Sequence, residues 1–273
     1  MNAFGKLVFA AGLLLFLAPH PALAQLARLD KTGKQFAAKF KHGKTRVAVV
    51  DFSSPAGSLP SQAHYLAWYL SSALQVRAND HLRVTDHLEF DREIATIRNS
   101  SVTSLSPDAL SEISSRINED VLILGTLEKK DASYVLSMNA VRVSNGNVLD
   151  SESTEIDASP FLESLSIPLQ PKDGQLLTRS GAKGVQQPHC DYCPDPSYDD
   201  LAREAKVQGV CILETIISPE GTIQQIHPLK LIGYGLDEKA YEKVATWRLE
   251  PPRNKDGTPI SLVVPVEVTF RLY

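Results

Sequence analysis

Apolar and polar positions along the chain form two ordered regions, separated by a stretch without a regular period. In the first region, nearly continuous apolar runs at 45–52 and 121–127 predict buried strands. The segment 61–76 carries apolar residues at helical spacing and predicts a helix with a broad apolar face. Between these segments we expect a short strand at 82–86 and a helix at 90–97.

The first region continues with a predicted helix and a β-hairpin. A Ser-Pro pair at 106–107 is typical of a helix start, because Ser caps the helix and Pro fits its first turn. Alternating residues at 133–143 and 147–156, joined by Asn-Gly at 145–146, predict the hairpin. The order β-α-β-α-α-β-β-β indicates an N-terminal α/β sandwich at 25–156.

A stretch rich in Ser, Pro, Gly and Lys follows and predicts a linker at about 157–184. It contains a few apolar residues, among them Phe161, Leu162 and Ile167, so part of it is expected to pack against a neighbour.

The second region has the order α-β-β-α-β and predicts a compact C-terminal domain at 185–273. Asp237 is the expected N-cap of its second helix. Together, the two regions predict an α+β protein of two small domains. The expected elements of the second region are helix 198–207, strands 210–218 and 222–232, helix 235–247 and strand 261–273.

The N-terminal segment has the three parts of a secretory signal peptide. Lys6 supplies the positive charge, an apolar run follows at 7–17, and Ala-Leu-Ala at 22–24 gives the small-x-small pattern of a cleavage site. We expect cleavage after Ala24, which removes 1–24 and leaves an exported protein in the periplasm. The alternative is an uncleaved membrane anchor, but a span needs roughly 20 apolar residues and this run is shorter.

The net charge and the placement of the glycines argue against nucleic acids and phosphate-containing cofactors as ligands. The net charge is −4 and no basic block is present, which argues against nucleic acid as a partner. Gly233 and Gly235 are expected to serve backbone turns, because no strand-loop-helix phosphate pattern surrounds them. We therefore expect no cofactor, and membrane association only through partners or an uncleaved signal.

The stretch CDYCPDPSYDD at 190–200 holds two of the three cysteines. An oxidising compartment favours a disulfide between Cys190 and Cys193, with Cys211 free. A bond from either of them to Cys211 is the alternative, because sequence does not fix connectivity. Redox catalysis is disfavoured: a reactive Cys-x-x-Cys opens a helix, whereas the prolines after Cys193 predict an extended segment.

A zinc site would need about four ligands. The candidate ligands are Cys190, Cys193, Cys211 and either His189 or His227. Only Cys190 and Cys193 have the paired spacing of zinc ligands, and the other two ligands of the set do not. The scattered histidines are likewise not at metal or catalytic spacing, so we expect no metal site and no enzymatic activity. These histidines are His42, His64, His81, His87, His189 and His227.

Residues 45–156 resemble the N-terminal-type domain of the CsgG/FlgO/TolB group of bacterial envelope proteins. The resemblance lies in the strand RVAVVDFSS, the helix after it, and the block NEDVLILGTLEKKDASYVLSMNAVRVSNGNVLDSES. It implies an envelope-binding or assembly fold. Pore-forming segments like those of CsgG are not evident, so the resemblance does not imply a secretion channel.

Residues at about 185–273 are similar to the C-terminal domain of TonB and its relatives. The shared pattern begins with a short helix that contains Ala and Arg, a strand that follows Gly, and a Pro-x-Gly turn. A second helix then starts at Gly-Leu-Asp and ends near Trp, and a Pro-rich turn leads to the final strand. It is carried by AREAKVQGVCILETIISPEGTIQQI, GYGLDEKAYEKVATWRLEPPRNKDGTPI and VPVEVTFRLY. One departure is Tyr198-Asp199, where the family often has Tyr-Pro, and it argues against carrying over partner contacts at that helix.

The TonB resemblance implies an interaction protein that binds an envelope protein or receptor peptide by strand pairing. The closing strand is the expected edge. An anchored energy transducer for outer-membrane transport is the alternative if the N-terminal segment is retained. A thiol-disulfide or metal-dependent enzyme that uses Cys190 and Cys193 is a further alternative. The residues expected to bind the partner are Leu262, Val264, Val266, Val268 and Phe270.

Overall fold

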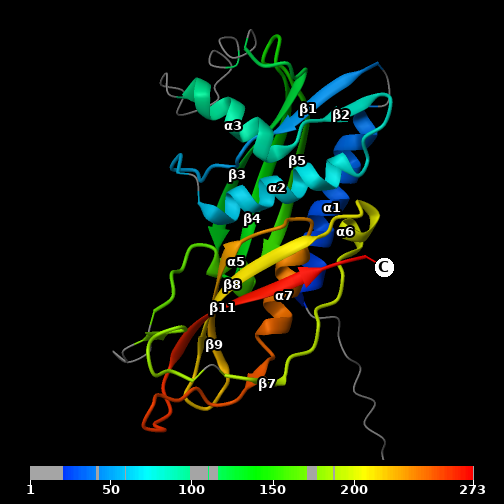
Figure 1. Cartoon of the computed structure of the whole chain (residues 1–273). Coiled ribbons are helices and arrows are strands. Elements are labelled where there is room, and N and C mark those ends of the chain that lie inside the picture. Colours follow the sequence, from blue (N-terminus) through cyan, green and yellow to red (C-terminus); the bar gives the residue numbers. More distant parts are fainter. Residues whose placement is uncertain are drawn as a thin grey trace, which may run out of the picture.

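The computed structural model confirms the expected α+β class, with helices and strands mixed along the chain (Figure 1). The helix expected to start at 106–107 and most of the expected signal peptide lie outside the described residues. No helix in the described part of the chain is long and apolar enough to cross a membrane. The structure describes residues 21–40, 43–58, 60–98, 110, 116–170, 177–186 and 188–272.

Five strands form the first sheet, in the order β2-β1-β3-β4-β5, in the upper half of Figure 1. β1 (Thr45–Val49) pairs in parallel with β2 (Leu82–Val84) on one side and β3 (Val121–Lys130) on the other. β3, β4 (Ser133–Arg142) and β5 (Val148–Asp157) form an antiparallel meander. The predicted strands and the Asn-Gly hairpin of this region are confirmed.

Helices lie on both faces of the first sheet. α1 (Pro21–Lys39) and α2 (Ser61–Gln75) pack on one face, as predicted for the broad apolar side of α2. α3 (His87–Arg98) packs on the other face through Phe90 and Ile94. Because successive residues of a strand point to opposite faces, β1 contributes side chains to both clusters and its apolar run is continuous.

The helix α1 was not expected from the sequence, where its first residues match a cleavage site. Leu29 and Phe36 are fully buried against α2 and the first sheet. Cleavage after Ala24 stays a prediction, and it would leave the buried residues of this helix in place.

Four strands form the second sheet, in the order β6-β11-β8-β9. β11 (Leu262–Phe270) pairs antiparallel with β8 (Gly209–Ile217), and β8 pairs with β9 (Ile223–Lys230). β6 (Thr178–Arg179) pairs only with the start of β11. The helix α7 (Leu236–Val244) packs on one face of this sheet.

The remaining elements of the second region are short. β7 (Cys190–Tyr192) and β10 (Arg248–Leu249) form a two-stranded sheet. α6 (Asp200–Glu204) is shorter than the predicted helix, because Asp199 caps its start and Lys206 takes a positive φ just after its end.

The predicted role of Asp237 as an N-cap is wrong. Gly235, with φ +77°, occupies the N-cap position of α7, and Asp237 is fully buried inside the first turn. Its carboxylate accepts hydrogen bonds from the backbone nitrogens of Ile232 at 2.8 Å and Gly233 at 2.7 Å. Asp237 therefore holds the loop that precedes the helix, and the expected turn role of both glycines is confirmed by their positive φ angles.

The segment expected to be a linker contributes to the core. It contains α5 (Pro160–Ser164), and Phe161 within this helix is 1% exposed. The ring of Phe161 lies 4.9 Å from that of Tyr65 on α2 and 5.8 Å from that of Tyr241 on α7, measured between centroids. The two regions are thus in direct contact through this segment.

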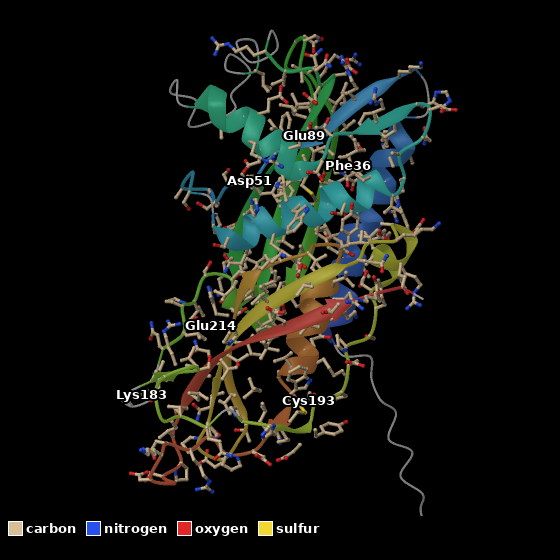
Figure 2. The ribbon with its side chains drawn as sticks, viewed as in Figure 1. Phe36, Asp51, Glu89, Lys183, Cys193 and Glu214 are labelled. Atoms are coloured by element: carbon tan, nitrogen blue, oxygen red, sulfur yellow. A yellow bond between two sulfur atoms is a disulfide. The ribbon has the colours of Figure 1, made fainter. Side chains whose placement is uncertain are left out.

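A second contact between the regions involves the loop before α7. Tyr234 donates a hydrogen bond from its hydroxyl to Gln75 Oε1 at 2.7 Å. The backbone of Gly233 packs so closely on Trp68 that a Cβ at this position would lie 2.8 Å from Trp68 Cζ2. Figure 2 labels Asp51 in the first region and Cys193 in the second, toward the opposite end of the molecule.

Candidate functional site

The edge of the second sheet formed by β11 is open along most of its length in the described part of the chain. Val263 O accepts a hydrogen bond from Ser180 N at 2.8 Å, and Ser261 O accepts one from Thr178 N at 3.3 Å. In a strand, every second residue directs both backbone groups to the same side. The backbone groups of the odd-numbered residues of β11 therefore point to this edge, and those of the even-numbered residues point to β8.

Three residues beyond the short β6 contact form the open edge, which we call the β11 edge: Pro265, Glu267 and Thr269. Pro265 has no N–H, and this side of an edge strand is where a proline is tolerated. Its carbonyl, together with the N–H and C=O groups of Glu267 and Thr269, points away from β8. The side chains of all three residues are exposed. The β11 edge therefore offers two backbone donors and three acceptors.

The five residues predicted to bind the partner lie on β11, between the residues of the β11 edge, and their role in binding stays a prediction. Their side chains are buried or half-buried, and Val266, Val268 and Phe270 belong to the cluster under α7. Because these five residues occupy even-numbered positions, their backbone N–H and C=O groups point to β8. The apolar-polar alternation from Val266 to Phe270 indicated which side chains face the core, but not which backbone groups face β8. The five predicted residues are Leu262, Val264, Val266, Val268 and Phe270.

Side chains of the opposite edge strand, β9, contact α5 and the segment after it. His227 on β9 contacts Ser164 O through Nδ1 at 3.0 Å. Gln225, also on β9, donates to Pro168 O at 3.3 Å and accepts from Gln170 N at 2.9 Å. Side chains of β9 are thus engaged by the segment after α5, whereas Pro265, Glu267 and Thr269 of the β11 edge make no such contact with the described part of the chain.

The cysteine prediction is confirmed: Cys190 and Cys193 form a disulfide, and Cys211 is free and buried. Cys190 lies in β7 and not at the start of a helix. Burial raises the pKa of the Cys211 thiol, and the neighbouring Asp237 adds to this shift. Within the described residues, the zinc ligands considered from the sequence do not come together. The pair therefore has the placement of a structural clip.

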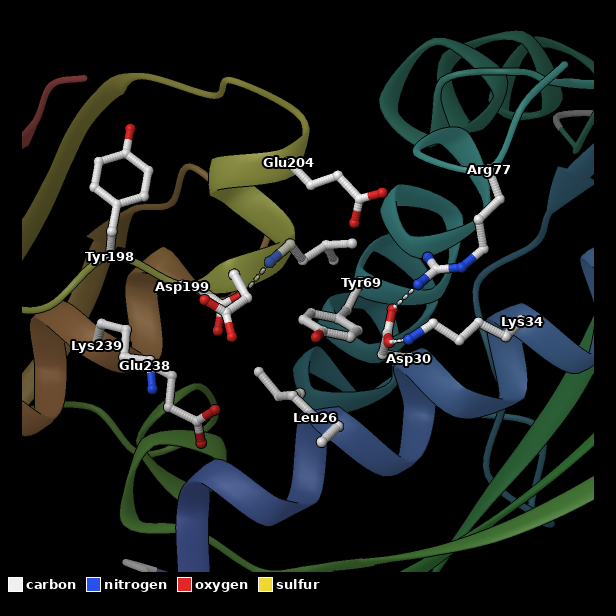
Figure 3. Close-up of a pocket in the computed structure, with 13 residues that line it drawn as sticks. Leu26, Asp30, Lys34, Tyr69, Arg77, Tyr198, Asp199, Glu204, Glu238 and Lys239 are labelled. Atoms are coloured by element: carbon white, nitrogen blue, oxygen red, sulfur yellow. Dashed lines mark hydrogen bonds and ion pairs between the residues drawn. The ribbon is translucent and has the colours of Figure 1, made fainter. Parts of the chain in front are cut away.

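A cavity of about 470 Å³ lies where α1 and α2 meet α6 and α7 (Figure 3). On one side, Asp30 pairs with Arg77 at 2.6 Å and with Lys34 at 2.9 Å. On the other side, burial raises the pKa of Glu238 to about 8, and repulsion from Glu242 adds to the rise. Glu238 Oε1 has no hydrogen-bond partner in the described part of the chain. The cavity thus places an uncharged carboxyl group between the two regions at neutral pH.

Comparison with protein families confirms the resemblance of the second region. Residues 194–272 match the family of the Gram-negative bacterial TonB protein C-terminal. None of the curated proteins matches the chain. The resemblance of residues 45–156 to the CsgG/FlgO/TolB group stays a prediction.

Several solved structures are similar to parts of the chain. The LpoB C-terminal domain from Salmonella enterica is 12% identical with a TM-score of 0.36, over 47% of this chain and 95% of that domain. The TonB CTD from Pseudomonas aeruginosa is 18% identical with a TM-score of 0.26, over 35% of this chain and 95% of that one. Lipoprotein GNA1162 from Neisseria meningitidis is 20% identical with a TM-score of 0.29, over 41% of this chain and 80% of that one.

Proposed function

We propose that the chain is an exported interaction protein of the bacterial envelope, which binds an extended segment of a partner protein by strand pairing at the β11 edge. The observation that carries this proposal is the open edge within the region that matches the TonB family. A peptide beside β11 would pair with the backbone of Pro265, Glu267 and Thr269. The proposal is one of binding and includes no catalytic step.

The number of free backbone groups limits the affinity. Five hydrogen bonds are available, and each contributes about 0.5–1.5 kcal/mol net. Ordering a flexible peptide offsets part of this gain. We therefore expect a short peptide to bind with a Kd in the range of roughly micromolar to millimolar. The exposed Glu267 carboxylate favours a peptide with Lys or Arg opposite it.

Amide hydrogen exchange of the isotope-labelled chain from Gln25 onward tests this pairing. In the free protein, the amides of Val266, Val268 and Phe270 should exchange slowly and those of Glu267 and Thr269 rapidly. Periplasmic peptides from outer-membrane receptors should slow the exchange of Glu267 and Thr269. A folded spectrum in which no peptide alters these two amides would reject the β11 edge as the binding surface.

The cellular location of the protein and the cleavage of its signal peptide are tested in a separate experiment. N-terminal sequencing of the protein recovered from the periplasm should begin at Gln25. An intact N-terminus in the inner membrane would instead support the anchored energy transducer.

A further inference from the structure

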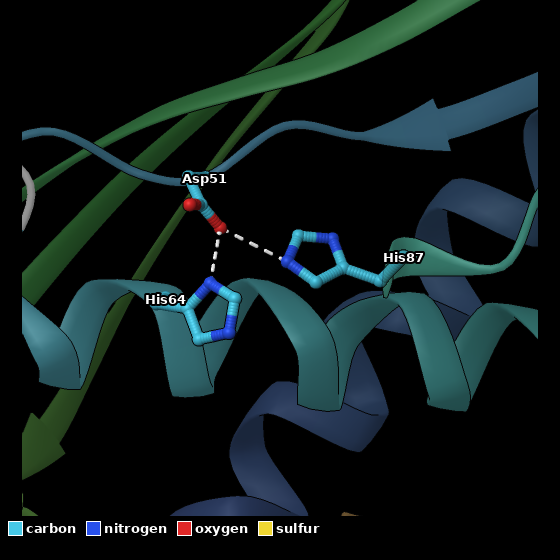
Figure 4. A group of neighbouring side chains, drawn as sticks. All are labelled: Asp51, His64 and His87. Atoms are coloured by element: carbon cyan, nitrogen blue, oxygen red, sulfur yellow. Dashed lines mark hydrogen bonds and ion pairs between the residues drawn. The ribbon is translucent and has the colours of Figure 1, made fainter. Parts of the chain in front are cut away.

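Three side chains converge at the carboxyl ends of β1 and β2, far from the β11 edge. Asp51 follows β1, His64 lies in the first turn of α2, and His87 is the first residue of α3 (Figure 4). In the order β2-β1-β3, the chain passes to one side of β1 through α2 and then returns to the other side after α3. Ligands of open α/β sheets bind in the crevice beyond the strand ends at such a reversal point.

The three side chains meet at a single oxygen. Asp51 Oδ1 lies 2.8 Å from His64 Nδ1 and 2.9 Å from His87 Nε2. One ligand atom from each residue lies within 4.8 Å of the other two. The His87 side chain is only 1% exposed and that of Asp51 10%, whereas that of His64 is 36% exposed. The cluster is therefore mostly enclosed but reachable from solvent past His64.

The hydrogen bonds of His87 show that either a proton or a cation must lie between its Nε2 and Asp51. Its Nδ1 lies 2.9 Å from Val49 O, and a carbonyl only accepts, so Nδ1 carries a hydrogen. In a neutral ring, Nε2 then directs a lone pair at the Asp51 carboxylate, which also only accepts. A cation between these atoms removes the conflict. An Nδ1–H bonded to a backbone carbonyl is also the usual support of a metal-binding histidine.

The surroundings add negative charge. Asp91, one turn along α3 from His87, lines the same crevice as Asp51 and acts electrostatically on His64. The Asp51 side chain is 10% exposed, and its Oδ1 lies within 3 Å of a ring nitrogen of each histidine, so it is placed to act as a ligand.

Two imidazole nitrogens and one carboxylate are the ligand types of zinc sites that keep a fourth position open. With bonds of about 2.0–2.1 Å, the ligand atoms around tetrahedral zinc lie roughly 3.3–3.4 Å apart. The two short distances to Asp51 Oδ1 would have to widen by about half an ångström. The partly exposed His64 side chain is free to make the first of these movements, and the second falls to the Asp51 carboxylate, because His87 is buried.

We propose that Asp51, His64 and His87 bind a divalent transition-metal ion, with Zn²⁺ as the best fit, in the crevice at the carboxyl end of β1. This site was not expected from the sequence, and it is independent of the strand-pairing function.

Metal titration of the chain from Gln25 onward tests the site, with no histidine tag, the disulfide intact and prior treatment with a chelator. Calorimetry should show one equivalent of Zn²⁺ bound, and Co²⁺ should give the visible absorption of a tetrahedral site. His64→Gln and Asp51→Asn should each weaken Zn²⁺ binding by at least about 100-fold. His81→Gln is the matched control, because His81 is exposed and contacts Gly43 O instead, and it should bind as the natural chain does.

Two results would overturn the proposal. One is the absence of stoichiometric Zn²⁺ binding, or binding that His64→Gln and Asp51→Asn leave unchanged in folded protein. The other is NMR evidence, with Zn²⁺ present, that both ring nitrogens of His87 carry hydrogens, which would assign the positive charge to a proton. Because His64 is partly exposed, its variant tests the site even if Asp51→Asn fails to fold.

Discussion

The two sheets of this protein offer ligands different parts of a strand. The first sheet has helices on both faces, and β1 is paired on both sides, so only the residues beyond its carboxyl end are free to bind. The second sheet has its helices on one face, and β11 keeps backbone groups unpaired along the described edge. A buried central strand therefore offers a ligand convergent side chains at its end, whereas an edge strand offers its backbone.

The contact that joins the two sheets gives the largest expected effect. Phe161 packs between Tyr65 of the first region and Tyr241 of the second. Phe161→Ala removes a fully buried ring and leaves a cavity, so we expect the free energy of unfolding to fall by about 3–5 kcal/mol. Urea denaturation measures this loss.

The two tryptophans report on the two regions separately. Trp68 lies on α2 and Trp247 follows α7. If the regions unfold as one unit, both signals change at the same urea concentration in the natural chain. Ile167→Ala, at a position 45% exposed in the same segment, is the control and should cost no more than about 0.5 kcal/mol. A loss below about 1 kcal/mol for Phe161→Ala would mean that the sheets are stabilised independently.

The next effect concerns the cavity between the regions. In the unfolded chain Glu238 ionises above its ordinary pKa of 4.5, whereas burial in the folded protein raises its pKa to about 8. The folded state therefore binds more protons between these values, and stability falls as pH rises from about 4.5 to 8. Glu238→Gln removes this titration and should reduce the loss between pH 5 and pH 8 by on the order of 2–4 kcal/mol.

Thermal and urea unfolding of the natural chain and Glu238→Gln at both pH values provide the measurement. Burial also raises the pKa of Asp237, to about 6, so its contribution to the stability of the protein falls as pH rises. Because Asp237 is present in both proteins, this contribution cancels in the comparison. An unchanged slope of stability against pH would show that the Glu238 carboxyl is hydrated, and that the two regions are less closely packed at this point.

A smaller effect is expected at the close approach of the loop before α7 to α2. Gly233→Ala would place a Cβ against the ring of Trp68 and force a non-glycine residue to φ +85°. Gly257→Ala shares the φ of +85° but has nothing within 4 Å of its Cβ, so it measures the backbone cost alone. We expect the first variant to be less stable than the second by about 1–2 kcal/mol in urea denaturation. Equal values would mean that the loop moves away from Trp68 at little cost.

The smallest expected effect is on peptide binding at the β11 edge, and it tests whether this edge is independent of the proposed metal site. Thr269→Pro removes one outward N–H of the β11 edge and should weaken peptide binding by about 1 kcal/mol, or roughly fivefold. Thr269→Ala keeps the N–H and should bind as the natural chain does. Fluorescence anisotropy of a labelled peptide measures the difference. Zn²⁺ binding should be the same in both variants, and a change in it would show that the two sites are coupled.

Much of the fold was predictable because it depends on local patterns. The apolar runs and alternation gave the strands, Asn145-Gly146 gave the hairpin, and the ordered TonB-type pattern gave the second region. The helix α1 was missed because its first residues also satisfy the pattern of a signal cleavage site. Asp237 was misplaced because an acidic residue at a helix start serves equally well as a cap or as an acceptor for the preceding loop.

The sequence by itself determined the class of the fold and the TonB resemblance of the second region, because each follows from residues close together in the chain. It favoured a Cys190–Cys193 disulfide, and the structure selected that pairing over a bond to Cys211. Only the tertiary structure decided which side of β11 is open, since that depends on where β6 and β8 pair. It alone brought His64 and His87 to Asp51, which lies 13 and 36 positions away from them in the sequence. The physical reason is that α2 carries the chain back along the sheet and the parallel strand β2 returns it to the carboxyl end of β1, a path that leaves no local periodicity in the sequence.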